Sequence, residues 1–192
     1  MLERRDFVKK LLTGRGELLV VTGLGSSTFD VAACGENAAN FHLWGAMGAT
    51  VMTGLGLALA RPNDRVAVLT GDGDLLMGLG SLSTVGVKQP KNLVIVVLDN
   101  RHYGETGMQH SHTNFGIDLI GIAKACRFPV THTISTENEI AHACELLHQP
   151  EGPVFMQVQV AATEDPRVMT MRDGVLLKDR FMRHLTETNS AG

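Results

Sequence analysis

Two uninterrupted apolar runs, residues 66–70 and 93–99, constrain the fold of this 192-residue chain more than any other feature. Both are rich in β-branched residues and neither alternates with polar residues, which is typical of strands buried on both faces of a parallel sheet. Between them, residues 79–87 fit a crossover helix. A strand, a helix and a strand in that order predict an α/β protein with an open parallel sheet and helices on both faces.

The rest of the chain continues this alternation. Further strands are predicted at residues 18–21, 130–133 and 154–160, and helices at residues 2–12, 46–60, 117–125, 136–147 and 176–185. Each glycine within residues 46–60 weakens a helix by about 1 kcal/mol relative to alanine, so we expect a close packing contact there. No linker or repeat divides the chain, and we expect one domain over residues 1–192 with a frayed tail at 187–192.

Composition excludes several classes of protein. The chain has 17 Lys and Arg against 20 Asp and Glu, a net charge of −3, which argues against a broadly basic nucleic-acid binder. No apolar stretch is long enough for a membrane span, and the first residues lack the apolar centre of a signal peptide, so we expect a cytoplasmic protein without a membrane partner. The three cysteines form no CxxC pair, which argues against a zinc ribbon or a clustered iron–sulfur site.

In an open parallel sheet, ligands bind beyond the carboxyl ends of the strands. The first strand is followed by Gly23-Leu24-Gly25-Ser26-Ser27-Thr28. This half-matches the dinucleotide fingerprint, but Thr28 stands where the third glycine should be, so an NAD site is weakly supported. A turn that presents amides and hydroxyls to a phosphate, or a plain strand-to-helix turn, fits equally well.

Two further turns carry oxygen ligands. Gly71-Asp72-Gly73-Asp74 follows one apolar run and Asp99-Asn100 follows the next, 28 positions after Asp72. Both turns lie at the carboxyl ends of strands that we expect to be neighbours, so their side-chain oxygens can converge on one ion. A hard cation such as Mg²⁺ prefers such oxygens and usually binds substrate phosphates as well.

Gly71-Asp72-Gly73, followed after 26 residues by Asn100, resembles the metal–diphosphate motif of thiamine-diphosphate-dependent enzymes. Three other segments are similar to this family: residues 45–48 to the stretch under the cofactor rings, residues 25–27 to the diphosphate loop, and residues 100–104 to the metal loop. The resemblance extends from about residue 18 to about residue 160 and implies the diphosphate-binding domain of the thiamine-diphosphate-binding fold.

The resemblance implies roles for individual residues. Asp72 and Asn100 would bind Mg²⁺ through side-chain oxygens, and His102 through its backbone carbonyl. Gly45 would offer its carbonyl to the aminopyrimidine, and Met47 would support the bent conformation of the cofactor. Gly73 and Asp74 would lie beside the diphosphate. The other residues implied in cofactor binding are Gly25, Ser26, Ser27, Gly71, Tyr103 and Gly104, together with Asn100. Asp99 departs from the pattern, because many relatives have asparagine there.

This family activates its cofactor with a glutamate on a separate pyrimidine-binding domain, for which 192 residues leave no room. The resemblance therefore implies an α subunit that carries this domain and its glutamate, and a hetero-oligomer. Residues 103–107, Tyr-Gly-Glu-Thr-Gly, are similar to a stretch of the sulfopyruvate decarboxylase β subunits and the phosphonopyruvate decarboxylases. The implied reaction is decarboxylation of a small 2-oxoacid, sulfopyruvate or phosphonopyruvate, to CO₂ and an aldehyde.

Three histidines follow the predicted metal loop: His102, His110 and His112. Because a histidine can exchange a proton near neutral pH, each is a candidate catalytic residue for proton transfer, in addition to Met47, which would support the cofactor. Histidines in a polar loop are, however, more often solvated. Two alternatives stay open. One is the β subunit of a 2-oxoacid oxidoreductase, whose relatives typically carry cysteine clusters, and the other is a thiamine-diphosphate-binding module without catalytic activity.

Overall fold

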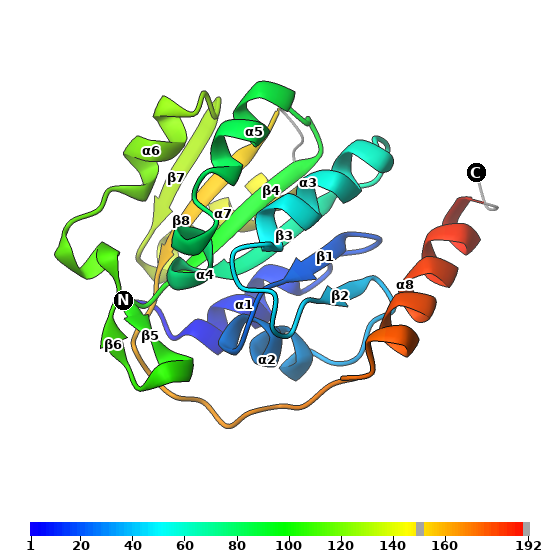
Figure 1. Ribbon diagram of the computed structural model, residues 1–192, viewed down its shortest axis with the longest axis horizontal. Helices are drawn as coiled ribbons and strands as arrows, with labels where there is room; N and C mark the ends of the chain where they lie inside the picture. Colours follow the sequence, from blue (N-terminus) through cyan, green and yellow to red (C-terminus); the bar gives the residue numbers. More distant parts are fainter. Residues whose placement is uncertain (149–151, 190–192) are drawn as a thin grey trace.

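The computed structural model describes residues 1–148 and 152–189, and it contains a sheet of six parallel strands (Figure 1). The strands are β1 (Leu19–Thr22), β2 (Asn40–His42), β3 (Val66–Gly71), β4 (Leu93–Asp99), β7 (Val130–Ile134) and β8 (Val154–Gln159). Their order is β2-β1-β3-β4-β8-β7, so β8, the last in sequence, lies inside the sheet. The predicted α/β class with a parallel sheet is confirmed.

Eight α-helices accompany these strands in the described part of the chain: α1 (Arg4–Leu12), α2 (Ser26–Ala33), α3 (Thr50–Ala60), α4 (Asp72–Met77), α5 (Ser81–Lys88), α6 (Leu119–Ala125), α7 (Ile140–His148) and α8 (Gly174–Asn189). A two-stranded hairpin, β5 (His102–Tyr103) and β6 (Gln109–His110), follows β4. Short 3₁₀ turns are η1 (Gly104–Thr106), η2 (His112–Phe115) and η3 (Glu137–Glu139). Within the described ranges, no helix combines the length and apolar character needed to cross a membrane.

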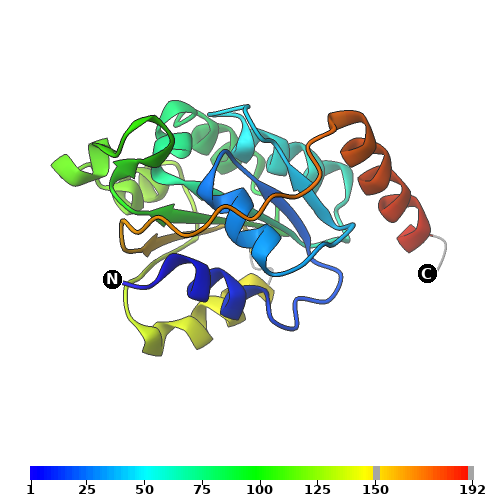
Figure 2. The ribbon, with the colours of Figure 1, turned by 90° about the horizontal axis from the view of Figure 1, so that it is seen from below.

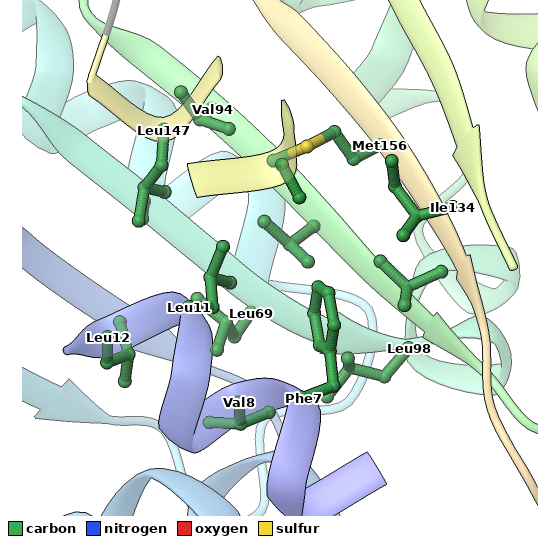
Figure 3. Packing of buried hydrophobic residues seen from close by; sticks show 14 of the residues in the cluster. Phe7, Val8, Leu11, Leu12, Leu69, Val94, Leu98, Ile134, Leu147 and Met156 are labelled. Atoms are coloured by element: carbon green, nitrogen blue, oxygen red, sulfur yellow. The ribbon is translucent and has the colours of Figure 1, made fainter. Parts of the chain in front are cut away.

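The core has two halves because successive strand residues point to opposite faces of the sheet. Val94 and Val96 pack into the half under α1 and α7, and Ile95 packs into the half under α3, α5 and α6. Figure 2 shows α1 and α7 together on one side of the sheet. Figure 3 shows the apolar side chains of that half, including those of Phe7 and Leu11, directed at the strands. Burial on both faces explains why these strands read as continuous apolar runs.

The structure differs from the expected elements in several places. The helix expected at residues 46–60 begins only at Thr50, and α2, β2 and α4 were not predicted from the sequence. The close packing expected of the α3 glycines is found at Gly54, where a Cβ would lie 2.1 Å from Cγ2 of Val68. It is not found at Gly56, where a Cβ would meet no packed atom within 4 Å. The tail expected to fray from residue 187 is helical through Asn189, and residues 190–192 lie outside the described part.

Residues 161–173 form no helix or strand and connect β8 to α8. This segment, orange in Figures 1 and 2, runs past the sheet to α8, which contacts β2. It contacts residues that follow the carboxyl ends of two strands: Met171 accepts a hydrogen bond from Trp44 Nε1 (2.9 Å), and Arg167 forms an ion pair with Glu105 (3.2 Å). The connection therefore borders the edge of the sheet where ligands are expected.

Candidate active site

A cleft lies at the carboxyl ends of β1, β3 and β4, which are adjacent in the sheet. The strand register pairs Gly71 with Leu98, so Asp72 and Asn100 leave neighbouring strands close together. From the set implied by the sequence, the cleft is lined by Ser26, Ser27, Met47, Gly71, Asp72, Gly73, Asp74, Asn100, His102, Tyr103 and Gly104. Gly25, Gly45, His110 and His112 are not part of this lining.

Asp72 is the most buried acid of the cleft, with 1% of its surface exposed. Its carboxylate oxygen Oδ2 accepts hydrogen bonds from the hydroxyls of Ser111 and, at 3.2 Å, Thr113. Because both hydroxyls bond to the same oxygen, neither uses Oδ1. Burial raises the pKa of Asp72 to about 6 and the nearby Asp99 carboxylate adds to the rise, whereas the two hydroxyls oppose it.

This environment suits a divalent cation. The protein provides neutral hydroxyls but no ion pair to the Asp72 carboxylate among the described residues. A positive ion beside it would stabilise the ionised form. The amide oxygen of Asn100 lies at the same cleft, and carboxylate and amide oxygens are the ligands that Mg²⁺ prefers. The donor set therefore fits Mg²⁺.

Asp99 is also buried, but its carboxylate is fully occupied by the protein. Oδ1 accepts from Thr113 Oγ1 at 2.8 Å and from the Arg101 backbone at 3.1 Å, and Oδ2 accepts from Gln157 Nε2 at 2.7 Å. The Thr113 hydroxyl thus lies between the two acids. These three hydrogen bonds satisfy the buried Asp99 carboxylate within the protein.

A tight turn follows Asn100. The side-chain oxygen of Asn100 accepts a hydrogen bond from the His102 backbone N–H at 2.9 Å, and Arg101 adopts a left-handed conformation with φ of 63°. The turn leads into the β5–β6 hairpin, where the backbone N–H of Ser111 donates to the Arg101 carbonyl at 2.8 Å. The hairpin therefore returns the chain to Asp72, which explains why Ser111 reaches the carboxylate from 39 positions away.

The glycine between the two acids of α4 lies in a narrow space. A Cβ at Gly73 would lie 2.6 Å from ring carbons of Tyr103 and 3.6 Å from Cε of Met47. These two side chains border the cleft from opposite loops, one after β4 and one before α3. A side chain at position 73 would therefore fill the space between them, which explains the need for glycine here.

The segment expected to begin the 46–60 helix is instead a loop over residues 45–49. Trp44 precedes it with φ of 41°, and Gly48 within it has φ of 85°, so neither residue is helical. Ala46 N–H donates to the Leu43 carbonyl at 3.0 Å, which closes a turn. The turn brings Met47 to the cleft and leaves Gly45 exposed.

The Ser26-Ser27 pair, expected in a loop, lies instead in the first turn of α2. Gly25 precedes this helix with φ of 69°, and a Cβ there would lie 2.6 Å from Glu105 Oε1. Thr28, which replaces the third glycine of a dinucleotide fingerprint, donates to the Gly23 carbonyl at 2.7 Å. Its hydroxyl thus closes the turn internally.

The three candidate histidines separate into different positions. His102 lines the cleft, and its ring lies tilted at 48° to that of His110, with centroids 4.6 Å apart. His110 and His112 are exposed, and His112 Nδ1 lies 3.0 Å from the Tyr103 hydroxyl. His102 is therefore the histidine placed to reach a bound molecule directly.

Several residues of the site were not identified from the sequence. The network around Asp72 includes Ser111, Thr113 and Gln157, and the lining also includes Arg4 and Glu105. One signal was available: Gln157 is a polar residue inside an apolar strand, and a buried amide needs a partner. The two hydroxyls gave no signal, because they lie far along the chain from the acids that they contact.

Comparison with known proteins adds three findings. A protein-family model described as thiamine pyrophosphate enzyme, C-terminal TPP binding domain, matches residues 23–158. The chain is 35% identical over 181 residues to the sulfopyruvate decarboxylase subunit beta of Methanocaldococcus jannaschii, covering 94% of this chain and 95% of that one. It is 35% identical over 141 residues to the phosphonopyruvate decarboxylase of Streptomyces viridochromogenes, covering 73% of this chain and 35% of that one.

The fold also resembles a solved structure, the 2-oxoglutarate:ferredoxin oxidoreductase from Magnetococcus marinus. The TM-score is 0.70 at 18% sequence identity, with 85% of this chain and 64% of that chain covered. At this identity, the likeness concerns the fold alone.

Proposed function

Because this chain belongs to the family of thiamine pyrophosphate enzymes, we propose that it is the β subunit of a thiamine-diphosphate-dependent decarboxylase that acts on sulfopyruvate or phosphonopyruvate. One observation carries the proposal. The similarity to a sulfopyruvate decarboxylase β subunit spans nearly the full length of both chains, at 94% and 95%. In this proposal, residues 1–192 form a single domain that is the β subunit, and another chain carries the rest of the active site.

In this proposal, Asp72 and Asn100 would hold Mg²⁺ through their side chains and His102 through its carbonyl, and the ion would supply positive charge to the diphosphate. Ser26, Ser27, Gly71 and Gly73 line the part of the cleft that would receive the phosphates, and Met47, Tyr103 and Gly104 would contact the rest of the cofactor. The turn at Asn100 and the hydroxyls on Asp72 support this assignment, because they fix the orientation of both side chains.

Thiamine diphosphate, when bound, supplies a thiazolium that accepts the electrons left by CO₂. The protein would orient it: Met47 from one side of the cleft, and Tyr103, which abuts Gly73, from the other. His102, which lines the cleft, would exchange a proton with the reacting molecule. His110 and His112 would act through their contacts with His102 and Tyr103.

A partner chain is part of the proposal. The match covers 35% of the phosphonopyruvate decarboxylase, so most of the length of that relative lies outside the matched part. Large apolar side chains are exposed at the end of α4 and in the segment after β6: Met77 is 68% exposed, Phe115 75% and Ile117 42%. In this proposal, these side chains belong to an interaction surface. The α subunit would dock here and supply the pyrimidine-binding domain with its activating glutamate.

The experiment is to measure CO₂ release from sulfopyruvate, phosphonopyruvate and pyruvate, with Mg²⁺ and thiamine diphosphate, by the chain alone and with its co-expressed α subunit. We expect turnover only from the assembled pair. Turnover by the chain alone at ordinary enzymatic rates would contradict the need for a partner. Coenzyme A-dependent reduction of ferredoxin would favour a 2-oxoacid oxidoreductase, and cofactor binding without turnover would favour a non-catalytic module.

A further inference from the structure

The last residue of Gly71-Asp72-Gly73-Asp74 has a buried carboxylate whose bonds differ from those of Asp72. Asp74 is 6% exposed, and its Oδ1 accepts from the Gly48 backbone N–H at 2.5 Å. Its Oδ2 accepts from the hydroxyls of Thr50, at 2.6 Å, and Thr70. The three donors come from the loop before α3, from α3 and from β3, so one side chain joins three segments to α4.

The contact with Gly48 fixes a loop that has no regular secondary structure of its own. Gly48 lies in residues 45–49, the loop that brings Met47 to the cleft, and its φ of 85° favours glycine. Helix α4 approaches this loop closely, because a Cβ at Gly78 would lie 2.0 Å from the Gly48 carbonyl oxygen. The loop and α4 are therefore held together by close backbone packing and by the Asp74 carboxylate.

A direct contact between the Asp74 side chain and a diphosphate is unfavourable compared with the hydrogen bonds that this carboxylate makes to the protein. Three protein donors already occupy this carboxylate. A diphosphate is itself an anion and offers no donor, and two negative charges at contact distance repel each other. The side chain can serve a bound cofactor through the loop that it holds.

We infer that Asp74 is a positioning residue, which fixes Gly48 and thereby the loop that carries Met47, so that the support for the cofactor rings is in place before the cofactor binds. The inference rests on the proposed function, because it requires thiamine diphosphate in this cleft. It changes the role that the family resemblance implies for Asp74, from contact with the diphosphate to placement of the opposite, ring-supporting side of the cleft.

Two ligands separate these roles. Inorganic pyrophosphate with Mg²⁺ fills the diphosphate part of the cleft alone, whereas thiamine diphosphate with Mg²⁺ also needs the ring support. Asp74→Asn keeps the side-chain volume but cannot accept all three hydrogen bonds as the carboxylate does. In the full chain assembled with its α subunit, we expect roughly a tenfold higher Kd for thiamine diphosphate, as for loss of one charge-assisted hydrogen bond. The Kd for pyrophosphate should change by less than about twofold.

The fluorescence of Trp44, the single tryptophan of the chain, follows both titrations, since this residue directly precedes the loop. If Asp74→Asn fails to fold, Thr50→Val removes one hydrogen bond to the Asp74 carboxylate and should also raise the Kd for thiamine diphosphate. Thr50→Ser keeps the hydroxyl and should restore the affinity for thiamine diphosphate. On a Met47→Ala background, Asp74→Asn should raise the Kd for thiamine diphosphate less than about twofold further.

Equal losses for both ligands would overturn the inference and assign Asp74 to the diphosphate. An unchanged Kd for thiamine diphosphate in Asp74→Asn would also overturn it. If the unsubstituted complex binds no thiamine diphosphate, the proposed function fails instead, so the two failures are distinguishable.

Discussion

Two regions near the cleft, called here the floor and the rim, differ in how far this chain alone buries and hydrogen-bonds their side chains. The floor, defined as Asp72, Asp99, Ser111, Thr113 and Gln157, is buried, and its side chains hydrogen-bond to one another. The rim, defined as Met77, His110, His112, Phe115 and Ile117, lies outside the lining of the cleft and is exposed, although most of its residues are apolar or aromatic. In the proposed complex, one chain would thus complete the floor, and a second chain would cover the rim.

The largest effect should follow from removing the central acid of the floor. Asp72→Ala deletes a proposed metal ligand, and even partners that only orient a ligand typically contribute 10–100-fold to affinity. We expect the Mg²⁺-dependent affinity for thiamine diphosphate to fall by roughly 100-fold or more, as measured by calorimetry. Asp6→Ala, which removes an exposed acid of α1, is the matched control. Unchanged affinity in Asp72→Ala would refute the ligand assignment.

Substitutions in the rim should weaken association with the α subunit rather than affinity for the cofactor. Phe115→Ser should weaken association with the α subunit by roughly tenfold or more, because buried aromatic residues dominate interface energies. The Tm of the isolated chain should hardly change, since this side chain is 75% exposed. Val87 on α5 is equally exposed, and Val87→Ser is the control. Equal weakening by both variants, measured by sedimentation, would remove the distinction between the rim and the remaining surface.

A smaller effect is expected at the hydroxyl between the two acids. Thr113→Val keeps the shape of the side chain but removes the hydrogen bonds to Asp72 and Asp99. We expect about a tenfold loss of Mg²⁺ affinity, measured by titration in the presence of thiamine diphosphate. Thr113→Ser retains the hydroxyl and should restore most of the affinity. If valine and serine behave alike, the floor does not depend on this hydroxyl.

The smallest effect concerns the pH dependence of stability without metal. The pKa of Asp72 in the folded chain is about 6, above its ordinary value of 3.8, because burial disfavours the charged carboxylate. Its contribution to stability is therefore fully present below pH 3.8 and is lost as the pH rises through 6. In EDTA, wild type should lose on the order of 1 kcal/mol more unfolding free energy than Asp72→Asn between pH 5 and pH 7.5. Denaturant titrations giving the same loss for both would contradict this.

The sequence predicted the elements whose residues carry one consistent pattern. The runs at residues 66–70 and 93–99 are strands β3 and β4 because their apolar side chains pack into the core clusters on the two faces of the sheet. Strand β2 was missed because it has three residues, Asn40–His42, which is too short for a pattern. Residues 46–49 were wrongly assigned to a helix, since their small apolar side chains suit one. The bond from Gly48 to Asp74 holds them in a loop, and it joins positions 26 residues apart.

The candidate site was predictable only in part for a similar reason. The glycine and acid turns after β3 and β4 are local in sequence, so the chain brings Asp72 and Asn100 to one cleft as expected. The residues that orient these ligands are remote, with Thr113 41 positions from Asp72 and Gln157 58 positions from Asp99. Such pairs follow from the path of the β5–β6 hairpin and the insertion of β8, which no local pattern specifies.

The position of β8 inside the sheet has a consequence for how this protein is made. Strand β4 pairs with β8 from Val94 to Asp99, yet β8 begins at Val154, 55 residues after β4 ends at Asp99. While the ribosome synthesises the intervening residues, β4 has an open apolar edge, which is a template for pairing with other chains. Chaperone binding during synthesis should therefore concentrate on this strand, and it should end once the ribosome has released residue 159.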